Sequence, residues 1–214
     1  MTAVVVLASA NRNKLEELNA LLCGLPMRLQ TMVDLGVEPA EEQAATFVEN
    51  ALAKARHAAS VTGLPAIADD SGLSVVALKG LPGVRSARFA GANATDKQNN
   101  QKLVRLLRGT PDDSDGRCAT FVSSLVYLSS PADPVPIVVS ASWHGRIVDA
   151  PRGSNGFGYD PHFLIGGSEQ TAAELRAEEK NRISHRAKAA RMFRPALQTR
   201  LAKSAPRTVD GSGI

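Results

Sequence analysis

The chain has 214 residues, of which 43% are hydrophobic and 21% are charged. These fractions are typical of a folded globular protein, and they exclude a disordered or fibrous chain. A chain of this length buries most of the surface that its unfolded form exposes, so we expect one domain, or two lobes that share one core, without a metal or disulfide staple. The 25 Lys and Arg residues exceed the 21 Asp and Glu residues by four. This small excess fits an anionic small ligand at least as well as nucleic acid.

Aromatic residues make up only 4% of the chain, which leaves few stacking platforms for single-stranded nucleic acid. Cys23 and Cys118 lie far apart and form no CxxC motif, so we expect buried, reduced thiols. No apolar run approaches the roughly 20 residues of a membrane helix, and residues 1–10 lack the basic start of a signal peptide. The sequence therefore predicts a cytoplasmic α/β protein with no membrane partner.

The first expected unit is a strand, a polar turn and a helix. Residues 3–8 are apolar and rich in β-branched side chains, which predicts a strand buried on both faces. Leucines then recur at helical spacing over residues 15–22. Between them Ser9, Asn11 and Lys14 lie where free backbone amides and the helix dipole attract anions, which suits a phosphate chain. The alternative is a plain turn with an N-cap and an exposed Lys, and the chain has no Walker A loop.

The second expected unit is a capped helix followed by a strand and two acids. Thr46 and Glu49 form a capping-box pair at the start of an apolar stripe, and Gly63 is expected to end this helix. Residues 64–68 predict a strand that ends in Asp69 and Asp70. Adjacent side chains on an extended segment point to opposite sides, so one acid can enter a cleft, where its oxygens suit Mg²⁺. The alternative is an Asx turn.

The rest of the chain predicts further segments: a glycine-rich stretch (80–91), a helix around residues 103–107, long strands (118–128 and 135–148) joined by a loop, a glycine-rich loop (152–167) and a mostly helical segment (172–203). We expect Pro195 to kink or divide the last helix. Residues 207–214 predict a frayed tail. The domain is therefore expected to span residues 1–201, and residues 202–214 to form a flexible tail.

Two later segments carry candidate binding residues. In the loop around Gly158, Phe157 and Tyr159 offer ring faces to a base and Asp160 offers an acceptor, although a mobile surface loop is the alternative. Further on, Lys180, His185 and Arg186 lie in a charged helical run. Lys180 is cationic, and His185 and Arg186 can direct donors at a carbonyl oxygen, but such runs are most often solvated helix faces. Glu41 and Glu42, before the capped helix, are most simply surface acids.

Five segments in this order resemble the inosine/xanthosine triphosphate pyrophosphatase family, from Val4 to about Leu201. They are Ser9-x-Asn11-x-x-Lys14, Thr46-Phe47-Val48-Glu49-Asn50-Ala51, Ala68-Asp69-Asp70-Ser71-Gly72-Leu73, Gly156-Phe157-Gly158-Tyr159-Asp160-Pro161 and Glu179-Lys180-x-x-x-Ser184-His185-Arg186. The resemblance implies an α/β fold of two lobes around a central cleft, built on a long curved mixed β-sheet flanked by helices and usually dimeric. It also implies Mg²⁺-dependent hydrolysis of ITP, dITP and XTP between the α- and β-phosphates, with no nucleic-acid partner.

The resemblance assigns roles to residues of this chain. Asp70 is implied as the base and a metal ligand, with Asp69 as the other catalytic candidate and Glu41 as a second metal ligand. The triphosphate would be bound by Ser9, Ala10, Asn11, Arg12, Asn13 and Lys14. Ser71 would touch the substrate, and the base would be held by Phe157, Gly158, Tyr159, Asp160, Lys180, His185 and Arg186.

Two positions depart from the family pattern. Ala10 stands where the family often has Gly, and Asn155 stands at a glycine position, which Asn tolerates better than most residues if φ is positive. The alternative within the same class is a Maf-like nucleotide pyrophosphatase, against which the 157–160 loop and Ser184-His185-Arg186 argue. The alternative from a different class is a nucleic-acid-binding module, which lacks the clustered aromatics it needs here.

Overall fold

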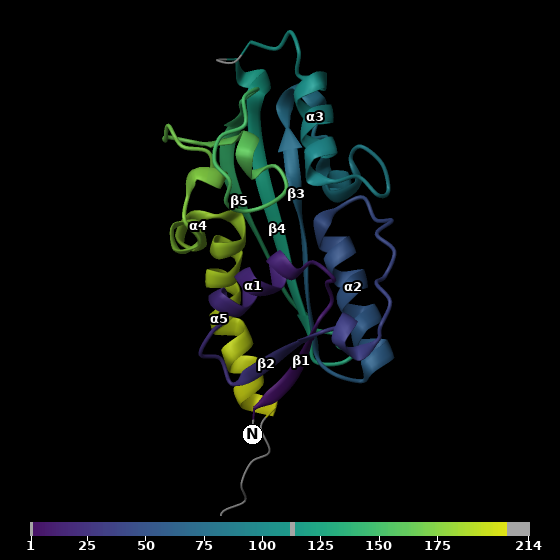
Figure 1. The fold of residues 1–214 in the computed structure, drawn as a ribbon. Helices are drawn as coiled ribbons and strands as arrows, with labels where there is room; N and C mark the ends of the chain where they lie inside the picture. The colour runs from purple at the N-terminus through teal and green to yellow at the C-terminus, as the bar shows by residue number, and fades with distance from the viewer. Residues whose placement is uncertain (1, 112–113, 205–214) are drawn as a thin grey trace, which may run out of the picture.

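The computed structural model describes residues 2–111 and 114–204, so the predicted tail at 207–214 lies outside the described residues. The architecture is a mixed six-stranded sheet in the order β2-β1-β3-β4-β5-β6, flanked by helices (Figure 1). The strands are β1 (Ala3–Leu7), β2 (Met27–Thr31), β3 (Ala66–Val75), β4 (Cys118–Leu128), β5 (Ile137–Ile147) and β6 (Phe163–Ile165). The helices are α1 (Arg12–Leu21), α2 (Phe47–Thr62), α3 (Asp96–Leu106), α4 (Ala177–Ile183) and α5 (His185–Ser204). The predicted α/β class with a mixed, helix-flanked sheet is confirmed.

Strand β3 joins the parallel and antiparallel halves of the sheet. It pairs with β1 in parallel at only two positions, Val6↔Ala66 and Leu7↔Ile67, but it pairs with β4 over its whole length in the antiparallel sense. The expectation that the strand ends at Asp69 and Asp70 is therefore wrong, because β3 continues to Val75 and both acids lie inside it. The antiparallel neighbour continues to supply backbone partners after β1 has ended, so the chain has no reason to turn there.

Alternate residues of the strands serve two different cores. On one face Val5, Leu7 and Ile67 pack with α1 and α5, and on the other face Val6 and Ala66 pack with the alanines of α2. Figure 1 shows α2 and α5 on opposite sides of the sheet. This arrangement explains why residues 3–8 are continuously apolar, since a strand covered on both faces needs no polar alternation. A third cluster, rich in aromatic side chains, fills the other end of the sheet.

The predicted helix boundaries near the turn and the capping box are confirmed. Asn11 caps α1 by accepting a hydrogen bond from the Lys14 amide at 3.2 Å. Thr46 and Glu49 form the reciprocal capping box of α2, and Gly63 ends that helix with a φ of 68°. Because each cap satisfies backbone groups that the first or last turn leaves free, these boundaries are fixed by local sequence.

The C-terminal helical segment breaks at Ser184 and not at Pro195. Ser184 has an extended backbone (φ −65°, ψ 164°) that ends α4, and its hydroxyl accepts a hydrogen bond from the Ala187 amide at 3.2 Å. Pro195 lies within α5, so the expectation of a division there is wrong. The break places His185 and Arg186 in the first turn of α5.

Both cysteines are free and exposed, so the expectation of reduced thiols is confirmed and that of buried thiols is wrong. Cys118 is the first residue of β4 and Cys23 lies in the turn after α1. Neither residue belongs to any of the three hydrophobic clusters. Among the described residues, no helix combines the length and apolarity that crossing a membrane requires.

Candidate active site

A cavity of about 300 Å³ opens where the turn after β1, the middle of β3, the 157–160 loop and the start of α5 meet. Its wall contains twelve of the residues that the sequence singles out: Ser9, Ala10, Asn11, Lys14, Ser71, Phe157, Gly158, Tyr159, Asp160, Lys180, His185 and Arg186. Arg12, Asn13 and Glu41 do not line it, and Asp69 and Asp70 lie just behind the wall, bonded to residues that do.

One end of the cavity is built by the turn between β1 and α1. The Ser9 hydroxyl accepts a hydrogen bond from the Asn11 amide at 3.2 Å, and Asn11 caps the helix, so these two side chains shape the turn. The Lys14 side chain is only 15% exposed, and its Nζ lies 3.2 Å from Asp69 Oδ2. The alternative of an exposed Lys is therefore wrong. Burial lowers the pKa of Lys14, although the Asp69 charge opposes the shift.

Asp69 lies behind the cavity wall and pairs with a cation at each end of the cavity, Lys14 and Arg186. Its Oδ2 accepts hydrogen bonds from Arg186 at 3.0 and 3.2 Å, and its Oδ1 accepts from Ser71 at 2.6 Å and Ser123 at 2.7 Å. Burial alone would raise the pKa of Asp69. The Arg186 and Lys14 charges and the two hydroxyls outweigh it and hold this pKa well below its ordinary value. Asp69 is therefore a carboxylate whose charged form is favoured, with hydrogen bonds on both oxygens.

Asp70 points to the opposite side of β3, as expected for adjacent residues of a strand. Its Oδ1 lies 2.6 Å from Lys54 Nζ, and its Oδ2 lies 3.5 Å from Asn50 Nδ2. Burial raises the pKa of Asp70, even though Lys54 opposes the shift. A carboxylate with a raised pKa and few bonds suits proton transfer better than one held like Asp69.

The Lys54 ammonium joins Asp70 to a second acid. It lies 3.0 Å from Glu42 Oε1, and Glu42 also bonds Arg88 at 2.5 Å. Burial alone would lower the pKa of Lys54, but Asp70 and Glu42 raise it. Glu42 lines the cavity, whereas Glu41 is exposed and accepts a hydrogen bond from Gln43. The structure thus brings Glu42, and not Glu41, beside Asp70.

The carboxylates of Asp70 and Glu42 beside Lys54 are suitable ligands for Mg²⁺. Among the described residues, no group of three or more His, Cys, Asp or Glu side chains is arranged to hold a metal by itself. Asp70 and Glu42 nevertheless share one cation, the Lys54 ammonium. Mg²⁺ prefers hard oxygen ligands and typically binds one or two carboxylates together with substrate phosphates and water. Two carboxylates on one cation therefore suit a metal that arrives with a phosphate ligand.

The other end of the cavity combines an aromatic ring with cations. Lys180 Nζ lies 4.8 Å from the Phe157 ring centroid, and the Arg186 guanidinium carbon lies 5.8 Å from it. Lys180 also bonds Asp160 Oδ2 at 2.6 Å and Glu17 Oε1 at 3.0 Å. Lys180 and Arg186 are buried, so the alternative of a solvated charged helix face is wrong.

His185 lies flat against the aromatic core. Its ring stacks on Phe121 with centroids 4.9 Å apart and an interplanar angle of 13°. Burial, reinforced by the Arg186 charge, holds the pKa of His185 well below its ordinary value, so the imidazole is neutral. Its Nδ1 has no hydrogen-bond partner among the described residues. A neutral imidazole in the cavity wall can accept or donate one hydrogen bond to a ligand.

The 153–161 loop is held in place by many hydrogen bonds, so the alternative of a mobile surface loop is wrong. Asp160 Oδ2 accepts from the Phe157 amide at 2.9 Å. Gly156 has a φ of 74°, and a Cβ there would collide with the Asp160 carboxylate. Asn155 is not among the described residues with positive φ; its side-chain amide instead donates to the Leu175 carbonyl at 3.0 Å.

Tyr159 contributes differently from Phe157. Its ring is buried and its hydroxyl donates to the Ser86 carbonyl at 2.8 Å, while burial raises its pKa. Tyr159 therefore fixes the loop to the segment after β3, and Phe157 is the more exposed of the two rings.

The sequence did not identify three residues that complete the site: Glu17, Asn50 and Lys54. Glu17 bonds both Lys180 and Arg186, and it lies one helical turn after Lys14. Asn50 and Lys54 are four residues apart on one face of α2. A search for polar residues three or four positions from Lys14 and from Thr46 would have found Glu17 and Asn50, and the same step from Asn50 leads to Lys54.

Comparison with known proteins identifies the family of the chain. The sequence model of the Ham1 family matches residues 5–196. A dITP/XTP pyrophosphatase of Shigella flexneri is 52% identical over 194 residues, covering 91% of this chain and 98% of that protein. One from Ralstonia nicotianae is 54% identical over 188 residues, covering 86% and 92%. Among solved structures, a HAM1 protein from Coxiella burnetii superposes with a TM-score of 0.83 at 44% identity, covering 94% of this chain and 100% of that one. The Mycobacterium abscessus nucleoside-triphosphatase / dITP/XTP pyrophosphatase gives a TM-score of 0.72 at 42% identity, covering 90% and 99%.

Proposed function

The chain belongs to the Ham1 family, and we propose that it is a pyrophosphohydrolase of deaminated purine nucleoside triphosphates. Its substrates would be dITP, ITP and XTP, cleaved between the α- and β-phosphates to a nucleoside monophosphate and pyrophosphate. The observation that carries this proposal is a single cavity with lysines and carboxylates at one end and an aromatic ring under two cations at the other. Such a cavity matches a triphosphate joined to a base.

At the phosphate end, Lys14 and Lys54 would bind the triphosphate and stabilise the negative charge that develops on the leaving pyrophosphate. Both ammonium groups are largely buried, and charge stabilisation is strongest where water is excluded. Asp70 and Glu42 would hold Mg²⁺, which supplies Lewis-acid activation of the phosphate when it is bound. Asp70 would orient a water molecule and accept its proton, since burial raises its pKa toward the working range of a base.

At the base end, Lys180 and Arg186 would read the carbonyl oxygen at C6. The ammonium of Lys180 has three donors, of which Glu17 and Asp160 take two. Arg186 has five donors and makes four hydrogen bonds to Asp69, Ser71 and Glu17. One N–H therefore remains on each side chain for a carbonyl acceptor.

Adenine presents an amino donor at C6, which would face these donors unpaired. An unpaired buried polar group costs about 1–3 kcal/mol, which gives roughly tenfold or greater rejection of ATP for each contact. Phe157 would support the base by stacking. The cytoplasmic location and the homodimer that the resemblance implies are part of the same proposal.

A substrate panel tests the proposal. The protein is incubated with ITP, dITP, XTP, ATP, GTP, UTP or dTTP, with Mg²⁺ or with EDTA, and pyrophosphate and orthophosphate are measured separately. We expect pyrophosphate and the monophosphate from the deaminated purines, at a kcat/KM at least tenfold above that for ATP, and no turnover in EDTA. Orthophosphate as the product would contradict the cleavage position. A preference for UTP or dTTP would favour the Maf-like alternative.

A further inference from the structure

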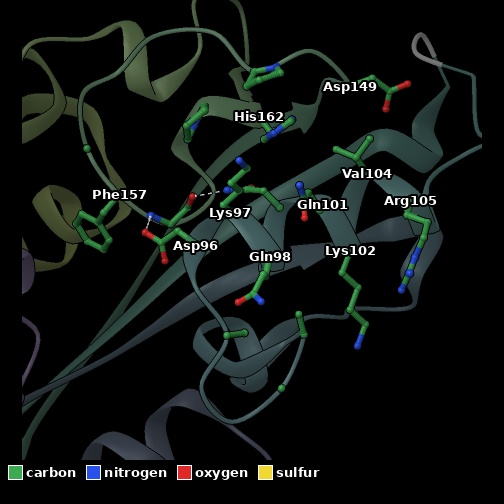
Figure 2. Close-up of a pocket in the computed structure, with 18 of the residues that line it drawn as sticks. Asp96, Lys97, Gln98, Gln101, Lys102, Val104, Arg105, Asp149, Phe157 and His162 are labelled. Carbon is green, nitrogen blue, oxygen red and sulfur yellow. Dashed lines mark hydrogen bonds between the residues drawn. The ribbon is translucent and has the colours of Figure 1, made fainter.

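A second cavity, of about 1240 Å³, lies along α3 beside the segment 149–162. We call it the α3 groove. Its helical wall is one face of α3 and the turn after it, formed by Lys97, Gln101, Val104, Arg105 and Arg108. The spacings of three and four residues place these side chains in one row. Figure 2 shows Lys97, Gln101, Val104 and Arg105 along the helix, with Asp149 and His162 on the neighbouring segment.

The Lys and Arg side chains that line the α3 groove outnumber its carboxylates, so the groove carries an excess of positive charge. Lys97, Arg105 and Arg108 are exposed and form no ion pair among the described residues. Both carboxylates of the lining are already bonded: Asp149 to Arg117 at 2.6 Å, and Asp96 to the Gly158 amide at 2.6 Å. A helix face that is merely solvated usually alternates acids and bases at spacings of three or four residues. No acid follows Asp96 in α3, so this row of cations has no such partners.

The α3 groove borders the nucleotide cavity through one residue of the base loop. The Gly158 amide donates to Asp96 Oδ2, and the Gly158 carbonyl accepts from Asn100 Nδ2 at 2.7 Å. Phe157, Gly158 and Asp96 line both cavities. The Asn100 Oδ1 is buried without a hydrogen-bond partner among the described residues. Such an atom destabilises a fold, which suggests that the amide is kept for its hold on Gly158.

We propose that the α3 groove is a second anion site that binds the oligophosphate chain of a nucleotide or an inorganic oligophosphate. Lys97 and Arg105 are about 12 Å apart along the helix axis at 1.5 Å per residue, and Arg108 follows in the turn after α3. This row suits a chain of linked phosphates better than a single small anion. Phe157 is the only aromatic ring other than His162 in the described lining, so stacking platforms for single-stranded nucleic acid are too few.

An anion bound along this row would lie on the helix that holds Gly158 on both its amide and its carbonyl. The inference goes beyond the proposed activity and does not depend on it, because occupancy of the α3 groove is measured without turnover.

Isothermal titration calorimetry in EDTA at low ionic strength tests the proposal with two probes: inorganic tripolyphosphate and the α,β-methylene analogue of ITP, which resists cleavage between the α- and β-phosphates. We expect two anions bound per chain for the parent. The variant Lys97→Gln/Arg105→Gln/Arg108→Gln should lose one of them, with at least a tenfold weaker second binding event. The matched control is Arg28→Gln/Arg182→Gln/Lys203→Gln, which removes three exposed charges from residues that line neither cavity and should keep both sites.

The two probes separate the sources of the anion. Equal second-site affinities would assign the site to inorganic oligophosphate, and tighter binding of the analogue would assign it to nucleotides; both support the proposal. Anion binding that the triple variant retains unchanged, or equal weakening in the triple variant and in the control, would overturn it, whereas a single site in the parent that is lost in the triple variant alone would count against the proposed function and not against the α3 groove. Binding of a single-stranded oligonucleotide that tightens with length, with no second tripolyphosphate site, would also overturn it in favour of nucleic acid. Circular dichroism of all variants verifies that these surface changes leave the fold intact.

Discussion

The two faces of β3 shift the pKa of an aspartate in opposite directions. Asp69 faces Lys14, Arg186, Ser71 and Ser123, and its pKa is held well below its ordinary value. Asp70 faces the other side, where Lys54 is its close ionic partner, and burial raises its pKa. Asp69 is an anion that binds one cation from each of two helices, Lys14 of α1 and Arg186 of α5. Asp70 has a raised pKa. Neighbouring carboxylates therefore acquire separate roles from their surroundings alone.

The largest expected effect is on stability, from Asp69→Asn. The change leaves Lys14 and Arg186 buried beside a neutral amide, and breaking a buried charge pair costs about 3–5 kcal/mol. We expect a loss of that size in the free energy of unfolding, measured by urea denaturation. The matched control is Asp70→Asn, which should lower the free energy of unfolding by less than Asp69→Asn does, because Lys54 keeps Glu42 as a partner at 3.0 Å and burial already disfavours the Asp70 charge. Equal losses in both variants would remove the distinction between the two faces.

A smaller effect of the same kind is expected from the serines of β4. The Ser123 hydroxyl donates to Asp69 Oδ1 at 2.7 Å, whereas Ser124, opposite Asp70, bonds Ser140 instead. A hydrogen bond to a charged group contributes about 1.5–3 kcal/mol and a neutral one about 0.5–1.5 kcal/mol. Ser123→Ala should therefore lower the free energy of unfolding more than Ser124→Ala does. The reverse order, in the same urea titration, would show that Asp69 does not depend on its hydroxyl partners.

On the Asp70 face, Lys54→Gln should alter the metal requirement. The Lys54 ammonium lies between the two carboxylates proposed for Mg²⁺, and a cation at that place opposes binding of a second one. We expect the Mg²⁺ concentration for half-maximal activity to fall by about threefold to tenfold, while kcat falls because a phosphate-binding charge is lost. A matched change away from the site, Lys203→Gln, should leave both values unchanged. An increased Mg²⁺ requirement would place the metal elsewhere.

The smallest expected effect is the pH dependence of stability, which should run in opposite directions for the two acids. The folded-state pKa of Asp69 is lowered, so its stabilisation is present above its unfolded value of about 3.8 and is lost as pH falls. The folded-state pKa of Asp70 is raised, so its contribution is present below that value and is lost as pH rises through the folded pKa.

Urea titrations between about pH 3 and 6 measure both trends. The deficit of Asp69→Asn relative to the parent should shrink toward pH 3. Asp70→Asn should gain stability relative to the parent toward pH 6, by less than about 1 kcal/mol. Parallel trends in the two variants would contradict the assignment of opposite surroundings.

Features set by neighbouring residues were predictable from the sequence. The Thr46 capping box and the Gly63 terminus depend on hydrogen bonds within a few residues, and both are confirmed. The strand through Asp69 extends beyond its prediction because its partner, β4, is about fifty residues away in the chain. Strand ends depend on such distant pairing, which a local pattern does not contain.

The predicted site was incomplete for a similar reason. The cavity residues from the turn, the loop and α5 came from motifs, but Lys54 lies in an alanine-rich helix whose pattern predicts packing alone. The burial of Lys180 and Arg186 depends on the acids Glu17, Asp69 and Asp160, which come from three other parts of the chain. Likewise, the choice between Glu41 and Glu42 depends on Lys54 and Arg88, two distant cations that only Glu42 meets.

The central claim is that Asp70 is the reacting carboxylate, and it is tested most directly by single-turnover pyrophosphate release from ITP with Asp70→Asn. The amide keeps the shape of the side chain but loses the charge that holds Mg²⁺ and accepts the proton from water. We predict a rate at least about 10³-fold below the parent, with the affinity for the α,β-methylene analogue of ITP, measured in EDTA, retained within a few-fold. A rate within a few-fold of the parent would contradict the account and would make Asp69 the candidate base.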